Sequence, residues 1–166
     1  MKRKSLKVEE LATGLYQMSL MPEHLDELAK PLKTRADSKI LVDEETLDFN
    51  ITALYILAID YSAFLSFGET KVKNKIFNKF NEIVKETFSE DLYQLLNAKV
   101  LRFSDALKDK TASEPFLKLS LYFSQCITKE AIEDSSLALI TSVVFGGRVV
   151  SLKDFLNDIE STYSIV

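Results

Sequence analysis

The sequence has very few of the residues that most enzymes use as nucleophiles, proton carriers or metal ligands. It contains one histidine, His24, and one cysteine, Cys126, which lie far apart in the chain. A structural zinc site needs four Cys or His ligands, and the common di-iron bundles need two Glu-x-x-His motifs. Phosphate-binding loops, dinucleotide-binding glycine patterns and Gly-x-Ser-x-Gly motifs are also missing from the sequence. We therefore expect no metal and no cofactor, and the enzymes left are those built on carboxylates.

Glycine and proline are also scarce, with four and three residues respectively. Sheet proteins of this size usually need more of both residues in their turns. Long helices with few connections need little of either, so the composition predicts an all-α fold. The 166 residues suit one domain, and 46% of them are apolar, which is enough for a core without disulfides.

Charge of one sign is not in large excess. The net charge of −4 favours a soluble protein and argues against broad binding of nucleic acid. The basic residues at positions 1–4 are not followed by an apolar segment, so we expect no secretion signal and a cytoplasmic location. The apolar stretch 47–67 is long enough to span a bilayer, but Asp48 and Asp60 would each cost about 2.5–3.5 kcal/mol near its centre. We therefore interpret this stretch as a core helix and expect no membrane.

Apolar residues at helical spacing predict a compact bundle of six to eight helices in a single domain. Short helices occupy residues 1–33, a linker follows at 34–45, and the bundle core covers 46–166. We expect the apolar helices 46–67 and 115–127 at the centre of this core, because apolar residues surround both. Amphipathic helices are predicted at 70–88 and 90–108, with Gly68 and Ser89 marking helix boundaries. On the second of these helices, Leu95 is expected to point inward.

The region 129–161 has two interpretations. In the first, a helix at 129–145 ends at Gly146 and Gly147, and a last helix covers 152–161. In the second, residues 140–145 and 148–152 form a hairpin around the two glycines. A lone two-stranded hairpin is only marginally stable, so helix is favoured, while a short hairpin near 140–152 stays open.

Asp60 is the first candidate for a site, since it lies about 120° from the polar stripe of its own helix. A buried carboxylate is costly unless it is paired. Lys99 lies in the middle of the apolar face of helix 90–108, and Arg102 flanks that face. One hypothesis is a structural pair of Asp60 with Lys99, Arg102 or a tyrosine hydroxyl. The other is a pocket in which these residues bind an apolar or anionic small molecule.

A row of lysines is the second candidate. Lys71, Lys75 and Lys79 follow one another at intervals of four on helix 70–88, and Lys73 and Lys85 add to the charge. This arrangement opposes the helix dipole, which hints at an acidic partner such as a nucleic acid. An ordinary solvated face explains the same pattern, and the inward position of the neighbouring aromatics leaves no surface for stacking bases.

The short N-terminal helices supply the third feature, an apolar edge. It comprises Leu20, Met21, Leu25, Leu28 and Leu32. This edge either folds back on the bundle or docks on another chain, because helix-in-groove recognition uses the same spacing. With a large core and no assembled chemistry, we expect a nonenzymatic interaction protein that binds a protein partner or itself as a homodimer. The alternatives are a nucleic-acid-associated module that uses helix 71–85 and a bundle that binds a small ligand near Asp60.

Overall fold

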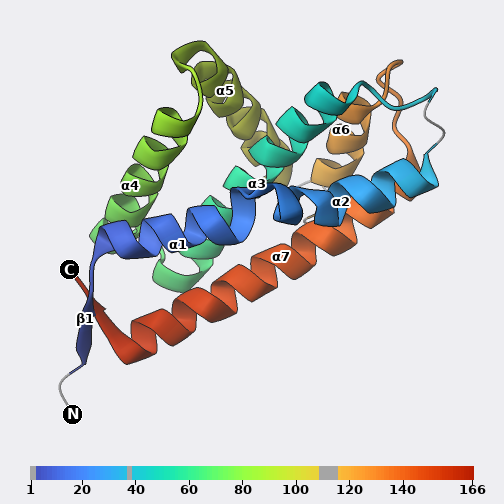
Figure 1. Ribbon diagram of the computed structural model, residues 1–166. Helices are drawn as coiled ribbons and strands as arrows, with labels where there is room; N and C mark the ends of the chain where they lie inside the picture. The colour runs from blue at the N-terminus through green and yellow to red at the C-terminus, as the bar shows by residue number, and fades with distance from the viewer. Residues whose placement is uncertain (1–2, 37–38, 109–115) are drawn as a thin grey trace.

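A computed structural model of the protein describes residues 3–36, 39–108 and 116–166. These residues form seven helices and one small parallel sheet (Figure 1). In chain order the elements are β1 (Lys4–Leu6), α1 (Val8–Leu20), α2 (Pro22–Arg35), α3 (Glu44–Phe67), α4 (Lys71–Thr87), α5 (Glu90–Leu107), α6 (Leu117–Ile127), α7 (Ser135–Thr162) and β2 (Tyr163–Ile165). The prediction of an all-α bundle with six to eight helices is confirmed.

Helix α3 forms the centre of the molecule, as its apolar sequence predicts. Every residue from Asn50 to Ile59 is buried, and α3 contacts each of the other six described helices. The Asp43 carboxylate caps its start by accepting a hydrogen bond of 2.8 Å from the Thr46 amide. At its other end Gly68 adopts φ 61° and ψ −161°, a backbone conformation open to glycine almost alone.

Helix α7 is the largest departure from the sequence-based expectation. Residues 135–162 form one continuous helix that runs along α3 and α6, so both the break at Gly146 and the hairpin near 140–152 were wrong. Two glycines inside a helix each cost about 1 kcal/mol relative to alanine. Burial of Phe145, Val149 and Leu152 on one face outweighs that cost, because each large apolar side chain contributes about 1.5–3 kcal/mol.

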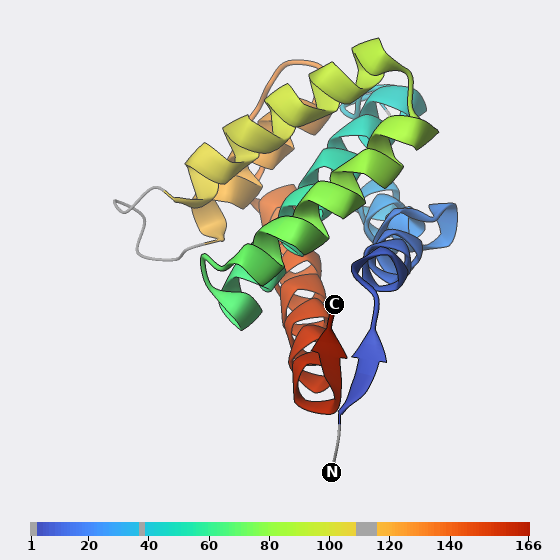
Figure 2. The same ribbon diagram turned by 90° about the vertical axis from the view of Figure 1, so that its left-hand side faces the viewer.

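The strands lie at the two ends of the chain instead. Strand β1 pairs in parallel with β2, with Lys4 opposite Tyr163 and Leu6 opposite Ile165 (Figure 2). Helix α1 consequently begins at Val8, and a strand occupies the start of the region 1–33 that was predicted to hold only short helices. A segment of three residues is too short to show the alternation of apolar and polar residues that indicates a strand. Each strand is also stable only beside its distant partner, so the local sequence could not predict either strand.

The segment between α2 and α3 is tied to the chain just after α6. Leu41 forms an antiparallel bridge with Thr128, and the Val42 amide donates to the Ile127 carbonyl at 3.0 Å. Helix α6 itself lies at the periphery and buries one face against α5 and α7, while Leu117 on its other face is exposed. The expectation that helix 115–127 is central was therefore wrong, and its predicted first residue, Pro115, lies outside the described residues.

Two of the described helices are long and apolar enough to cross a membrane by length and composition alone. They are α3 and α7, with 67% and 33% of the most apolar window buried inside the fold. A buried core helix passes the same test, and α3 is buried in the core of this fold. Helix α7 differs from α3 because the larger part of its apolar window is not covered by the rest of the protein.

Two glycines predict opposite responses to the same substitution. Gly68→Ala should lower the free energy of unfolding by about 1–3 kcal/mol, because the backbone of an alanine is strained at a positive φ. Gly14→Ala, in α1, should raise it by about 0.5–1 kcal/mol, because a methyl group there meets no atom within 4 Å and alanine favours helix. Urea unfolding of both variants measures the two changes, and equal signs would contradict the assigned backbone conformations.

Candidate protein-binding groove

An open groove of about 910 Å³ lies where two helix corners meet the first half of α3. The corner between α1 and α2 supplies one wall with Leu20, Met21 and Leu25. The corner between α4 and α5 supplies the other wall with Phe88, Leu92 and Leu95. The remaining lining comes from α3, where Phe49 and Thr52 are joined by the acidic residues Glu44, Glu45 and Asp48 near the start of the helix.

Local sequence signals create both corners. Met21 is extended, with φ −69° and ψ 147°, and Pro22 then begins α2 because proline is favoured in a first helical turn. Phe88 is likewise extended, and Ser89 caps α5 by accepting a hydrogen bond from the Leu92 amide. At each corner one helix therefore ends and the next begins, and apolar residues lie both before and after the corner.

The groove leaves large apolar side chains in contact with water. Leu95 is 60% exposed, so its predicted inward position was wrong, because α5 packs on the core through Leu96, Phe103 and Leu107. The apolar edge predicted at the N-terminus is divided between two roles. Its later members, Leu28 and Leu32, are fully buried, whereas Met21 remains exposed at the groove. The edge thus folds back on the bundle, and of its members Met21 stays exposed to solvent.

Electrostatics give the groove an acidic side. Burial raises the pKa of Asp48, with a smaller opposing effect from the nearby Lys33 ammonium. The charge of Glu44 is balanced by Lys33, whose Nζ lies 2.6 Å from the Glu44 carboxylate. Asp48 is therefore a carboxylate held partly away from water, and a positively charged group that entered the groove would stabilise its ionised form.

A second contact network fixes the wall formed by α1 and α2. The Arg148 guanidinium of α7 donates to the Met18 carbonyl at 2.8 Å, binds the Glu27 carboxylate and lies 4.8 Å from the centre of the Tyr55 ring. Burial raises the pKa of Tyr55, and the adjacent Arg148 charge opposes that rise. We did not find this network from sequence, because Gly146-Gly147-Arg148 resembled a turn rather than the inside of a helix.

Asp60, the first sequence candidate, pairs with a lysine of the charged row on α4. Its carboxylate lies 2.9 Å from Nζ of Lys73, which is buried on α4. The chain turns at Gly68, so the start of α4 returns beside the end of α3 and brings Lys73 to Asp60. The predicted pairing of Asp60 with Lys99 or Arg102 was wrong in its partner, although a structural ion pair is present.

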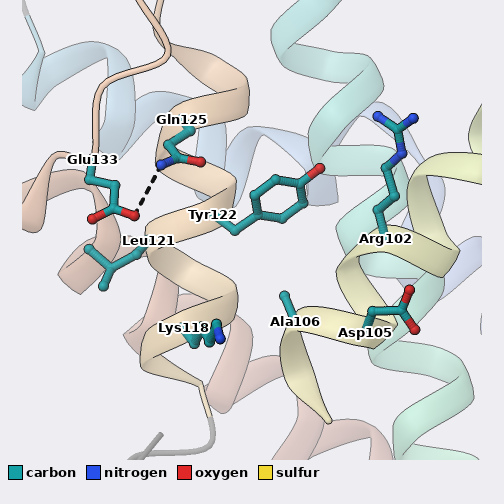
Figure 3. Close-up of a pocket in the computed structure, with 8 residues that line it drawn as sticks. All are labelled: Arg102, Asp105, Ala106, Lys118, Leu121, Tyr122, Gln125 and Glu133. Carbon is teal, nitrogen blue, oxygen red and sulfur yellow. Dashed lines mark hydrogen bonds between the residues drawn. The ribbon is translucent and has the colours of Figure 1, made fainter. Parts of the chain in front are cut away.

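Lys99 and Arg102 instead face α6. Lys99 Nζ lies 3.6 Å from Cys126 Sγ, and the Tyr122 ring points from α6 toward Arg102 (Figure 3). Burial raises the pKa of Tyr122, while Arg102 acts in the opposite direction. The recess beside them, of about 590 Å³, is lined by cations and anions together, including Arg102 and Asp105. It therefore has no charge of one sign with which to select a ligand, and the groove is the stronger candidate.

The lysine row on α4 is partly neutralised. Lys79 binds Glu82 at 2.6 Å, and Lys85 binds Glu90 at 2.9 Å. Each glutamate raises the pKa of its lysine. Lys71 and Lys75 are exposed, so they carry most of the positive charge that this helix presents to solvent.

Among the described residues, the structure groups no set of metal ligands and does not bring His24 and Cys126 together. Within 3–36, 39–108 and 116–166, no three His, Cys, Asp or Glu side chains are grouped so as to hold a metal ion. His24 lies beside Glu27 of its own helix, at 3.1 Å, whereas Cys126 lies beside Lys99. Comparison with known proteins assigns no family or function, because no family model, no curated protein and no solved structure matches the chain.

The ion pair between Asp60 and Lys73 yields a stability prediction. Asp60→Asn should lower the free energy of unfolding by about 1–3 kcal/mol, because it leaves the buried Lys73 ammonium without its main counter-charge. Adding Lys73→Met should recover much of the loss, since the uncompensated charge is then gone. A double-mutant cycle by urea unfolding measures the coupling, and full stability of the Asp60→Asn variant would contradict the pairing.

The raised pKa of Asp48 predicts a dependence of stability on pH. Below the ordinary pKa of aspartate, the folded and unfolded chains both bind the proton, so the side chain carries no penalty. The penalty develops as the pH rises from that value through the higher pKa of the folded state. Asp48→Asn should therefore leave unfolding unchanged at acid pH and stabilise the protein at neutral pH. Urea unfolding across this range tests the sign, and destabilisation at neutral pH would contradict it.

Proposed function

We propose that this protein is a nonenzymatic interaction module whose groove binds an amphipathic, basic helix of a protein partner. The observation that carries the proposal is the pair of apolar walls facing each other beside Asp48. Exposed apolar surface that is rimmed by polar residues often marks a protein-binding site. In the groove, Met21 and Leu95 remain exposed from opposite walls.

The form of the groove favours a helix over a compact ligand. Pockets for small molecules usually bury 70–90% of the ligand surface, whereas this groove is open to solvent along the sides of its helices. An amphipathic helix needs only one face covered and presents apolar residues at intervals of three and four. Such a face would contact both walls at once while its polar side stayed in water.

Charge decides which helix fits. Glu45 and Asp48 lie in the groove lining, and burial disfavours the ionised form of Asp48. A lysine or arginine beside the apolar face of the partner would compensate this carboxylate. The protein as a whole carries a net charge of −4, which also attracts a basic partner.

The two alternatives from the sequence have less support. A nucleic-acid-associated module would depend on the lysines of α4, and two of these, Lys79 and Lys85, bind glutamates. At Asp60 the carboxylate is already paired with the Lys73 ammonium, so an anionic ligand would have to displace Asp60 from that lysine. Neither region combines exposed apolar side chains with one sign of charge, as the groove does.

Binding of a model peptide tests the proposal. A labelled peptide of leucine and lysine, patterned as an amphipathic helix, should bind with an affinity that Leu95→Lys lowers by at least about tenfold. Fluorescence anisotropy measures this change, and Asp48→Asn should weaken binding in the same assay.

Leu101→Lys is the matched control, because Leu101 is 66% exposed on the same helix but does not line the groove. It should bind the peptide like the unchanged protein. A leucine–glutamate peptide of the same pattern should bind much more weakly. Equal binding of the two peptides, or an equal effect of the two lysine variants, would reject the groove as the site.

A further inference from the structure

The outer side of α7 is an uncovered apolar face separate from the groove. Leu139, Val143 and Val150 are 65%, 66% and 57% exposed, and Gly147 lies exposed between them. At about 100° per residue these four positions fall within roughly 80° of one another. Figure 1 shows α7 along one edge of the molecule, where one of its sides has no neighbouring helix.

The face is apolar over its whole length. The one charged residue between Ser135 and Ser151 is Arg148, and its guanidinium is turned inward toward Glu27 and Tyr55. Gly147 has no packing role within the chain, since a Cβ there would meet no atom within 4 Å. Glycine at such a position costs about 1 kcal/mol of helix stability and allows another backbone to approach closely.

Charges of opposite sign lie at the two ends of this face. At its start, the Arg35 guanidinium reaches within 3.4 Å of the Ser136 hydroxyl, beside the positive end of the helix dipole. At its other end, Asp154 is exposed at about the same angle around the helix as Ser136. The face is therefore self-complementary for a second copy of α7 that runs in the opposite direction.

The positions agree with a two-fold axis. The midpoint of the apolar face, between Leu139 and Val150, falls between residues 144 and 145. The midpoint between Ser136 and Asp154 falls at residue 145. An axis at this point places Val143 of one copy opposite Gly147 of the other and brings Arg35 of each copy to Asp154 of the other. One rotation thus satisfies the apolar and the charged contacts together.

We infer that α7 is the interface of an antiparallel homodimer, with Val143 and Gly147 at its centre and Arg35–Asp154 pairs at its two ends. A membrane surface is a poorer occupant, because helices that lie on membranes usually carry several Lys or Arg beside the apolar face, whereas the one charged side chain of α7 between Ser135 and Ser151, Arg148, is turned inward. The inference does not depend on the groove, which is lined by other helices.

Sedimentation of the full chain over a concentration series tests the inference. The unchanged protein should show a reversible monomer–dimer equilibrium, and Val143→Lys should weaken it by at least about tenfold. Leu101→Lys is again the matched control, since Leu101 and Val143 are equally exposed. It should leave the dimer unchanged. A chain that stays monomeric at every concentration, or a dimer equally weakened by both variants, would overturn the inference.

Charge exchange tests the direction of the two helices. Arg35→Asp and Asp154→Arg should each weaken the dimer, and the two changes together should restore it, because each pair is then rebuilt with reversed charges. Absence of restoration would overturn the antiparallel arrangement. Binding of the unchanged protein to vesicles that contain anionic lipid, lost in Val143→Lys, would assign the face to a membrane instead.

Discussion

Burial of the middle of α3, from Asn50 to Ile59, on every side is the constraint on which the rest of the structure depends. A helix that is apolar around its whole circumference is stable in water only when other helices cover all of it. Two of the polar side chains inside it, Ser62 and Thr52, donate to nearby backbone carbonyls. Ser62 donates to the Ala58 carbonyl at 2.6 Å and lies 3.1 Å from the Val149 carbonyl of α7, and Thr52 donates to the Asp48 carbonyl. Each surrounding helix thus packs one face against α3 and exposes another face to solvent or to a partner.

This arrangement explains which parts of the fold could be predicted from the sequence. The end of α3 at Gly68 and the start of α5 after Ser89 are local signals, and both are present in the structure. The continuity of α7 through Gly146 is not local, because packing of Phe145 and Val149 outweighs the preference of two glycines. Spacing along one chain also could not show that α6 buries only one of its faces.

The same limit applies to the groove and its surroundings. Helical periodicity indicated an apolar edge near Met21, but it gave no reason to leave Leu95 in water, because the spacing of leucines on α5 fits an inward position equally well. Asp60 was singled out correctly as a carboxylate needing a cation, yet its partner depends on how α4 returns beside α3. Contacts between helices decide these details, and they follow from the whole fold rather than from any window of sequence.

Pairing of β1 with β2 has a consequence for biosynthesis. Residues 4–6 bond to residues 163–165, so the first strand leaves the ribosome long before its partner exists. At about 5–20 residues per second, roughly ten to thirty seconds separate the synthesis of the two strands. During that interval α1 is already made, while the sheet that holds its beginning is still half complete. The nascent chain therefore closes this end of the molecule last.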